Sequence, residues 1–448
     1  MIVLLPAGSS SINPYITEDL TERIEVVFYE PGLYGEPDLS LIPHDGYVWV
    51  FLPGAYPAVG ALDAVQGWLE QRSPAGIYGY TVTNDGLFGR PRMNRLGLWV
   101  APSIGSSLVV RAELLRKVLS DPIVPQEWWY QLRVEATETG LDHMPVKFEY
   151  REALDLQPAT ERPRVLKEIT GVNATVQGSA LVPQGSTDNT SVSVVIPSIG
   201  AEIDTPDGSE PAILRCVRSL RATADVAEII VVAGPRMPDS VLEEVTQLAG
   251  DLFRVVRVSD PFNFSTSCNT GVLAATGSHV LLLNDDVEAT EPGWLDTMLG
   301  TAVLPGVGAV GAQLLFPDGT IQHAGVIVSP RTLEPNHLYM HHDPDQIADP
   351  IVRSTAEFLV VTGACLLVDR ELYLSVGGLT EELPLNYNDV DFCLKLIAEG
   401  YTNLQCNTVS LIHRESTSRD PQLTEKEAAW MDRWEPWIAL DPYVNVWL

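Results

Sequence analysis

The sequence predicts an α/β fold built as two consecutive sandwiches, each with helices on both faces of a sheet. Two observations support this prediction. Short apolar runs alternate with segments of helical periodicity in the second half. The first half carries similar runs, and three of its segments align in order with the second half. A chain of 448 residues is long enough for two or three domains with buried cores.

The second half begins with a buried strand and an amphipathic helix, at residues 192–200 and 211–223. The alternation then continues with strand, helix, strand, helix and strand, in the ranges 227–234, 238–250, 253–260, 265–277 and 279–286. Strands that alternate with helices predict a mostly parallel sheet covered on both faces. Ligands of such sheets bind beyond the carboxyl ends of the strands.

The first half is expected to contain strands in four apolar runs, at 1–8, 24–31, 46–54 and 106–111. Three ungapped alignments pair it with the second half: 103–118 with 361–376, 46–56 with 277–287, and 127–140 with 387–400. Chance similarity between α/β segments is the alternative to a duplication. A polar, aperiodic stretch around 175–191 separates the halves. We therefore expect a domain at 1–160, a linker at 161–190 and a second domain at 191–448.

The composition excludes several classes of function. The formal net charge of −31 disfavours DNA, RNA and anionic lipid as partners. No apolar run is long enough to span a membrane, and no basic region precedes the apolar start of the chain, so neither a span nor a signal peptide is expected. The five cysteines are scattered, which indicates reduced thiols. Together these features predict a cytoplasmic protein.

Polar residues that could carry chemistry gather at predicted element ends. Asn284, Asp285 and Asp286 follow a buried strand, Asp389 and Asp391 precede a helix, His413 ends a strand, and Asn263 and Asn269 lie near a helix start. Each has a simpler explanation: a turn for the first group, a helix cap for one of the two later aspartates, and a structural role for the histidine. Asparagines near a helix start suit nucleotide or other anion contacts.

Together these side chains suit one reaction. Carboxylates and an imidazole on strand-end loops can bind a hard divalent ion, which neutralises a departing diphosphate. A further carboxylate can accept a proton from an incoming hydroxyl. This set predicts group transfer from a nucleotide diphosphate to an alcohol.

Residues 191–445 resemble inverting family-2 glycosyltransferases of the GT-A fold, the type that includes rhamnosyltransferases and O-antigen and cell-wall glycosyltransferases. The matching segments, in order, are "VSVVIP", "PFNFSTSCNTGVLAATG", "LLLNDDVE", "WLDTML", "VGAVGAQLLFPDGTIQHAGV", "VTGACLLVDRELYLSVGGLTEEL", "NYNDVDFCLKLIAEGY", "HRESTSR" and "DPYVN". The resemblance implies a Mn²⁺ or Mg²⁺ ion and a nucleotide-diphosphate sugar as donor.

The resemblance also implies roles for single residues. Asp286 would be a metal ligand, Asp285 would lie near the ribose or the metal, and His413 would complete the metal and diphosphate site. Asp389 would be the catalytic base. The nucleotide pocket would include Pro197, Asn263, Asn269 and Asn284, the donor–acceptor junction Thr362, Gly363 and Ala364, and the rim of the site His323.

Two departures from the family pattern stand out. The second strand of the second half ends in Ala233 and Gly234, where the family has an acidic residue that helps to hold the base, so the nucleobase stays open. In the aligned first half, Gly54 and Ala55 stand for Asp285 and Asp286, and Trp129 stands for Asp389. The first half is therefore expected to be a degenerate, non-catalytic copy. It could serve stability, assembly into a homo-oligomer, or acceptor binding.

Three other functions fit the sequence less well than a transferase. A catalytically inactive carbohydrate-binding or scaffold protein is the alternative, but the second half keeps Asp286, Asp389 and His413. A sugar nucleotidyltransferase needs a basic, Gly-rich phosphate loop, and "VVIPSIGAEID" has no Lys or Arg. "WMDRW" does not match the Q-x-x-R-W signature of processive synthases. The expected acceptor is a hydroxyl group on a glycan, a lipid-linked glycan or a protein.

Overall fold

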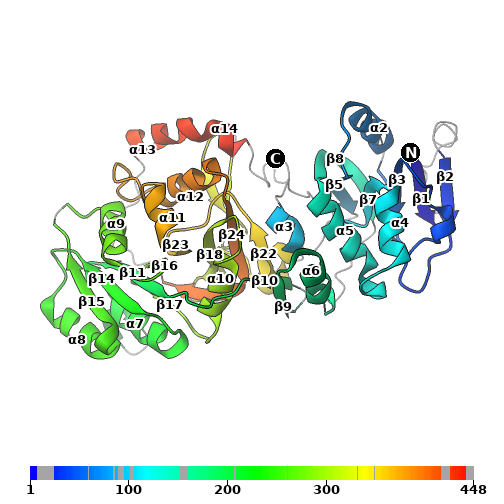
Figure 1. The fold of residues 1–448 in the computed structure, drawn as a ribbon. Helices are drawn as coiled ribbons and strands as arrows, with labels where there is room; N and C mark the ends of the chain where they lie inside the picture. The colour runs from blue at the N-terminus through cyan, green and yellow to red at the C-terminus, as the bar shows by residue number, and fades with distance from the viewer. Residues whose placement is uncertain are drawn as a thin grey trace. The chain divides into compact units, whose positions relative to one another are not determined.

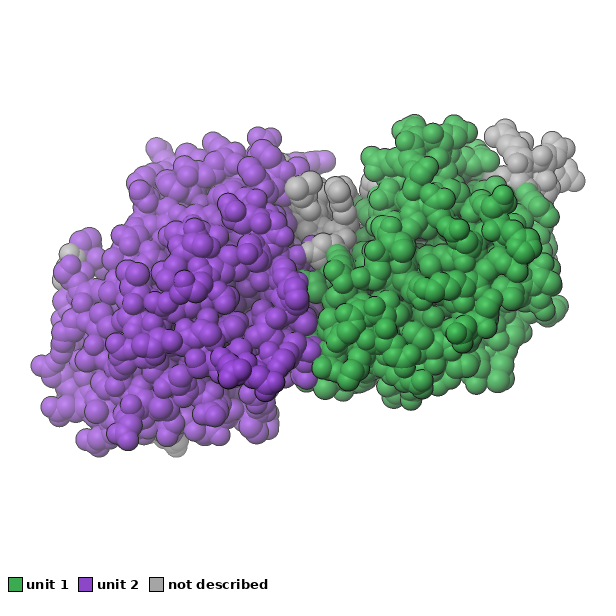
Figure 2. Space-filling view, viewed as in Figure 1, with its two compact units in different colours: residues 1–183, 442–448 green, residues 184–441 purple. Residues whose placement is uncertain are grey.

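The chain divides into two compact units, within residues 1–183 and 184–441 (Figures 1 and 2). The structure is a computed structural model, and it describes residues 1–7, 25–58, 60–83, 86–88, 95–100, 105–151, 160–178, 180–205, 208–259, 261–329, 331–347, 349–414 and 424–439. The segment "DPYVN" and most of "HRESTSR" lie outside these residues. No described helix is both long and apolar enough to cross a membrane.

Unit 2, residues 184–441, is built on one mixed sheet. Its strands run in the order β15 (Phe253–Arg257), β14 (Glu228–Ala233), β11 (Val192–Ser198), β16 (His279–Leu283), β23 (Cys365–Asp369), β18 (Val307–Leu315), β24 (Thr402–His413) and β17 (Val287–Glu288). The first four strands are mutually parallel, whereas β23 is antiparallel to both of its neighbours. β24 is parallel to β18, and β17 is antiparallel to β24. The predicted mostly parallel sheet is therefore mixed in its second half.

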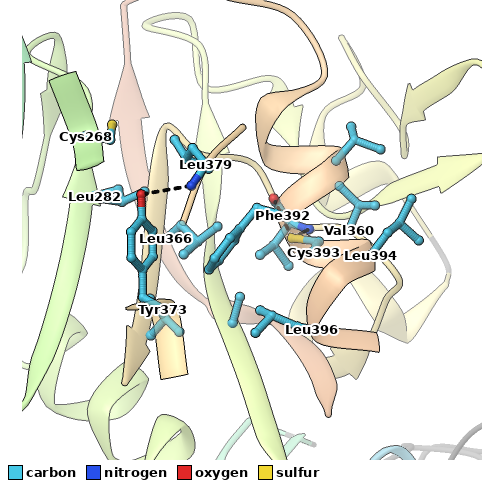
Figure 3. Packing of buried hydrophobic residues seen from close by; sticks show 14 of the residues in the cluster. Cys268, Leu282, Val360, Leu366, Tyr373, Leu379, Phe392, Cys393, Leu394 and Leu396 are labelled. Carbon is cyan, nitrogen blue, oxygen red and sulfur yellow. Dashed lines mark hydrogen bonds between the residues drawn. The ribbon is translucent and has the colours of Figure 1, made fainter. Parts of the chain in front are cut away.

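Helices cover both faces of this sheet (Figure 1). One face carries α9 (Phe264–Ala274), α11 (Arg370–Ser375) and α12 (Asn388–Ala398), and the other α7 (Ala212–Thr223), α8 (Asp239–Ala249) and α10 (Trp294–Ala302). Figure 3 shows the core beneath the first group, where Tyr373 and Phe392 pack with Leu366 and Leu394. The predicted α/β fold class is confirmed, because the expected helices and strands form at their predicted positions, to within one residue of the predicted ranges.

Unit 1, residues 1–183, repeats this strand arrangement. Its strands are β2 (Glu25–Tyr29), β1 (Ile2–Pro6), β3 (Tyr47–Phe51), β7 (Ser107–Arg111), β5 (Gly76–Thr83), β8 (Leu141–Arg151) and β4 (Ala55–Pro57), in sheet order. Each neighbouring pair has the same relative direction as its counterpart in the order β14, β11, β16, β23, β18, β24 and β17. In both sheets a further short strand, β6 (Gly86–Phe88) or β19 (Ile321–His323), pairs with the fifth strand of this order.

The described helices of unit 1 include α2 (Ala61–Gln71), α3 (Arg95–Val100), α4 (Ala112–Ser120) and α5 (Trp128–Thr139). The described residues form neither a closed barrel nor a helical bundle, although the duplication itself stays a prediction.

Strand pairing inside each unit shows which residues of the two units occupy equivalent positions. Phe51 pairs with Ser107, as Leu283 pairs with Cys365. Counting onward from these strand ends shows that Pro53 and Gly54 in unit 1 occupy the positions that Asp285 and Asp286 occupy in unit 2. The alignment that placed Gly54 and Ala55 there is wrong by one residue, because apolar strands of equal length leave their register undetermined in sequence.

Residues 161–190, expected to be a linker, instead carry regular structure. They include α6 (Arg162–Thr170), β9 (Asn173–Gln177) and β10 (Ala180–Gln184). The side chains of Val165, Leu166, Leu181 and Val182 are buried, which explains why this stretch folds despite its polar composition.

Candidate active site

The residues that follow β16 lie beside the end of β24. Three residues separate β16 from β17, and Val287 of β17 pairs with His413 at the end of β24. His413 Nε2 is consequently 3.0 Å from Asp286 Oδ1 and 3.2 Å from Asn284 Nδ2. Asn284, Asp285 and Asp286 are each only 6% exposed. Buried carboxylates are costly, so this segment is more than a solvent-exposed turn.

Gln322, which the sequence analysis did not select, fixes the orientation of His413. His413 Nδ1 lies 2.5 Å from Gln322 Oε1, a distance that requires a proton between them. With Nδ1 as the donor, Nε2 of a neutral ring carries its lone pair toward Asp286. Metal-binding histidines commonly donate their second nitrogen to an oxygen in this way. Gln322 stands next to His323 in sequence, but nothing in "IQHAG" distinguishes it.

Unsatisfied polar atoms surround this pair. Asn284 Oδ1 and Gln322 Nε2 are buried and have no hydrogen-bond partner among the described residues. Buried polar atoms without partners are rare and often mark a site where another group binds. Asp286, His413 and Asn284 Oδ1 offer the oxygen and nitrogen ligands that Mn²⁺ or Mg²⁺ accepts. No cluster of three His, Cys, Asp or Glu residues able to hold a metal occurs in the described parts of the chain.

Two arginines near this segment, Arg215 and Arg414, form ion pairs with a different carboxylate, that of Glu288. Arg215 and Arg414 contact Glu288, at 2.9 Å and 3.1 Å. Burial alone would raise the pKa of the Glu288 carboxyl, but hydrogen bonds from these arginines outweigh it and hold that pKa below its ordinary value. Asp285 instead accepts a 2.6 Å hydrogen bond from Ser198, next to Pro197 at the end of β11.

Asp389 lies in the first turn of α12, where its Oδ1 accepts a 2.8 Å hydrogen bond from the N–H of Val390, but it is not the cap residue. The cap residue is Tyr387, whose φ of 60° is left-handed and unusual for a non-glycine residue. Asp389 Oδ2 accepts a 2.9 Å hydrogen bond from the N–H of Gly363. A Cβ atom on Gly363 would lie 3.3 Å from Cβ of Asp389, so a side chain there would crowd the carboxylate.

Asp391 has a different, structural role. Its Oδ1 accepts hydrogen bonds from the indoles of Trp430 and Trp434, at 2.8 Å and 2.9 Å, and its Oδ2 accepts one from Thr380 at 2.6 Å. Lys395 Nζ lies 3.1 Å from Oδ2. Burial would raise the pKa of this carboxyl, but the four partners together hold it below its ordinary value. Asp391 thereby fastens the C-terminal helices to α12.

A cavity of about 650 Å³ brings most of the predicted residues together. Seven of them line it: Asn284, Asp286, Thr362, Gly363, Ala364, Asp389 and His413. His323 also lines it, but its side chain is fully buried and does not lie at a rim. The sequence analysis missed the other lining residues: Phe264, Leu314, Gln322, His337, Met340, Leu385, Asn386 and Asn388.

Asn263 and Asn269 lie elsewhere, around a second hollow formed with residues 377–382. Asn263 caps α9 through the N–H of Thr266, at 3.0 Å. The Asn269 amide donates to the carbonyl oxygen of Leu379 and accepts from the hydroxyl of Tyr373, at 2.8 Å and 2.7 Å. Both side chains hold the loop around Leu379, and neither lines the first cavity.

Comparisons with known proteins assign a family to part of the chain. Residues 193–349 match the family model described as glycosyl transferase family 2. This part of the chain belongs to glycosyl transferase family 2. The predicted family is thus confirmed for a segment that contains the acidic residues 284–286, whereas Asp389 and His413 lie beyond it.

Two curated proteins resemble the chain over part of its length. An uncharacterized protein of Sinorhizobium fredii is 40% identical over 207 residues, which cover 45% of this chain and 23% of that protein. The O-antigen biosynthesis protein RfbC of Myxococcus xanthus is 37% identical over 191 residues, or 41% of this chain and 15% of that protein. The chain therefore matches less than a quarter of the length of either relative.

Solved structures show only distant likeness. GalNAc-T7 with UDP, GalNAc and Mn²⁺ has a TM-score of 0.45 at 13% identity, covering 55% of this chain and 48% of that one. A Pyrobaculum calidifontis mannosyltransferase with GDP-Man and Mn²⁺ has a TM-score of 0.37 at 16% identity, covering 56% and 72%. TM-scores this low do not support an inference about function.

Proposed function

We propose that unit 2 is a metal-dependent, inverting glycosyltransferase that moves a sugar from a nucleotide-diphosphate donor to a hydroxyl acceptor. The observation that carries the proposal is the cavity in which the Asp286–His413 pair and Asp389 meet. The family-2 segment supports it, because it contains the acidic end of β16. A site that had lost its activity would be expected to have lost carboxylates as well. Unit 2 keeps Asp286 and Asp389, which favours an active enzyme over an inactive scaffold.

The chain's own residues divide the work. Asp286 and His413 would hold the metal together with Asn284 Oδ1, and the ion would neutralise the departing diphosphate. Asp389 Oδ1 or Oδ2 would accept the proton of the attacking hydroxyl. The N–H of Gly363 keeps the Asp389 carboxylate in place through its 2.9 Å hydrogen bond. Direct attack by the hydroxyl on the anomeric carbon breaks the bond to the diphosphate and inverts that carbon.

The acceptor is proposed to be a glycan, a lipid-linked glycan or a protein. The relative from Myxococcus xanthus, named for O-antigen biosynthesis, supports a glycan. Inversion can be tested directly by NMR, because the coupling of the anomeric proton reports the configuration of the first-formed product. Retention of the donor configuration would contradict the proposed direct attack.

Unit 1 is proposed to be a silent copy of the same fold. Arg151 pairs with Ala55 on the strands that correspond to β24 and β17, so it stands where unit 2 has His413. Trp129 stands where unit 2 has Asp389, and its indole N–H donates to the carbonyl of Gly105 at 3.2 Å. Gly105 corresponds to Gly363. In unit 2 the glycine donates a hydrogen bond to Asp389, whereas in unit 1 the glycine accepts one from Trp129. An indole cannot serve as the base.

We expect one molecule of nucleotide diphosphate to bind per chain, and only with a divalent ion. Isothermal titration of the full chain with UDP, GDP and dTDP, in Mn²⁺ and then in EDTA, measures both points. Asp286→Ala should weaken the Mn²⁺-dependent affinity by roughly 10-fold or more, because it removes a ligand of the ion. Asp296→Ala, on the exposed side of α10, is the matched control and should bind normally.

Three results would contradict this set of proposals. Equal affinity in EDTA would remove the metal from the mechanism. Two binding sites per chain would show that unit 1 is not silent. Unchanged affinity in Asp286→Ala would remove that carboxylate from the metal site.

A further inference from the structure

Glu288 binds two arginines that the proposed reaction leaves without a role. It lies on β17, directly after Val287 and close in sequence to Asp286. Arg215 of α7 approaches it as a fork, with Nη2 2.9 Å from Oε1 and Nε 3.2 Å from Oε2. Arg414, directly after β24, places Nη2 3.1 Å and Nε 3.3 Å from Oε2. One carboxylate thus connects a helix that covers the sheet to the end of a strand.

Helix α7 also holds the segment 284–289 at both of its ends. The thiol of Cys216 donates to the carbonyl oxygen of Asn284 at 3.6 Å. The N–H of Ala289 donates to the hydroxyl of Ser219 at 3.1 Å. The acidic segment is therefore fastened to α7 by its backbone, and the fork from the same helix adds a charged contact between these two ends.

β24 approaches the same segment through its own backbone. Val287 pairs with His413, and the N–H of Arg414 donates to the carbonyl oxygen of Asp286 at 3.2 Å. Because β17 has only two residues, few backbone hydrogen bonds hold it on β24. The ion pairs of Glu288 add to them. The three charged side chains are each about one-fifth exposed, and forked, partly buried ion pairs are stronger than fully exposed ones.

Unit 1 pairs the equivalent strands without such ion pairs. Tyr56 of β4 stands where β17 has Glu288, and its ring stacks on that of Tyr150 with the centroids 4.9 Å apart. The pairing of β4 with β8 therefore needs no carboxylate at this position. Unit 1 also has Arg151 in the place of His413. The carboxylate thus accompanies the proposed metal ligands and is not a general requirement of the strand pairing.

We propose that Glu288 is a positioning residue for the proposed metal site. Through Arg215 and Arg414 it keeps β17 against the end of β24. His413 Nε2 then stays 3.0 Å from Asp286 Oδ1, close enough for both to bind one divalent ion. Both oxygens of Glu288 face guanidinium groups, so Glu288 is not itself a ligand. The inference rests on the proposed metal-dependent function.

Glu288→Gln keeps the size of the side chain and removes its charge. We expect it to weaken the Mn²⁺-dependent affinity of the full chain for UDP, GDP or dTDP, whichever the wild type binds, by about tenfold. The transfer rate should return to the wild-type kcat at saturating Mn²⁺ and donor, because Asp389 and the ligands are unchanged. A general loss of folded protein would instead lower the number of binding sites and kcat together.

Glu210→Gln is the matched control for this experiment. It removes a carboxylate oxygen 3.2 Å from the same arginine, Arg215, but from β13 (Gly208–Pro211), and leaves β17 unchanged. Its Mn²⁺-dependent affinity should equal that of the wild type. Equal affinity in Glu288→Gln as well would overturn the proposal.

Arg414→Gln tests the same contact from the side of β24. It should weaken the Mn²⁺-dependent affinity, and combining it with Glu288→Gln should add nothing to the loss in Glu288→Gln alone, because both changes break one interaction. Losses that add fully in the double variant would contradict a joint action of Glu288 and Arg414.

Hydrogen exchange tests the positioning in EDTA, without metal or nucleotide. Backbone amides of residues 284–289 and 408–414 should exchange faster in Glu288→Gln than in the wild type and Glu210→Gln, whereas β11 and β14 should not change. Equal exchange in all three proteins would overturn the proposal. A wild-type chain whose nucleotide affinity is the same in EDTA would refute the proposed metal-dependent function instead, and exchange would still decide whether Glu288 holds β17 on β24.

Discussion

Asp389→Asn should lower the rate of sugar transfer by roughly 100-fold or more while leaving nucleotide-diphosphate affinity unchanged. The substitution keeps the size of the side chain, and its amide oxygen can still accept the hydrogen bond from Gly363. It removes the basicity that a proton acceptor needs. Donor binding should survive, because the Asp286–His413 pair is a separate part of the cavity lining. Donor affinity by calorimetry and single-turnover transfer, measured on the same preparation, separate the two effects.

Glu399→Gln is the matched control for this experiment. It removes the same charge from the exposed C-terminal end of the same helix, α12, and should transfer at the wild-type rate. The rival interpretation of Asp389 is a helix cap. Asn caps helices nearly as well as Asp, so a capping role predicts near-normal transfer in Asp389→Asn. That outcome would defeat the assignment of Asp389 as the base.

The sequence could predict the site residues that directly follow a buried strand. In "LLLNDDVE", the last three residues of β16, all leucines, are followed by three polar residues, so both the strand and its functional end are visible locally. His413 could be selected as a polar residue at the end of a predicted strand, but its contact with Asp286 could not be predicted from that position. Its position beside Asp286 depends on the pairing of Val287 with His413, which are 126 residues apart in the chain. Pairing between distant strands leaves no local signal in a single sequence.

Other residues of the cavity wall could not be predicted from the sequence for a related reason. Gln322, His323 and His337 lie on β19 and β21 (Pro335–His337), strands of three residues each. Strands so short show too little alternation to be recognised, and their position comes from pairing with β18 and β20 (Val326–Val328).

The two carboxylates at the start of α12 could not be told apart by sequence. Asp389 and Asp391 both lie in the first turn, and each suits the helix dipole. What separates them is the surrounding tertiary structure. The N–H of Gly363 binds Asp389, whereas the indoles of Trp430 and Trp434, 39 and 43 residues further along the chain, bind Asp391. This difference predicts that loss of Asp391 affects stability, whereas loss of Asp389 affects turnover.

Asp391→Ala should lower the free energy of unfolding of unit 2 by roughly 3–5 kcal/mol, the usual cost of removing one partner of a buried ion pair. Lys395, Thr380 and both indoles would lose their shared acceptor. Urea unfolding followed by hydrogen exchange in α12 measures the loss. Asp432→Ala, exposed on the same C-terminal segment as Trp430, is the control and should stay within about 0.5 kcal/mol.

The effect of Asp391→Ala should also depend on pH in a defined direction. The folded protein holds the pKa of this carboxyl below its ordinary value of about 3.9, so the folded state binds the proton less readily than the unfolded state. Its contribution to stability is therefore complete above about pH 4 and is lost as the pH falls through the lower, folded pKa. The stability difference between wild type and Asp391→Ala should be constant from pH 5 to pH 7 and shrink below about pH 4. A loss under about 1 kcal/mol at pH 7, or a difference that grows on acidification, would show that the hydrogen bonds from Trp430 and Trp434 do not hold the C-terminal helices on α12.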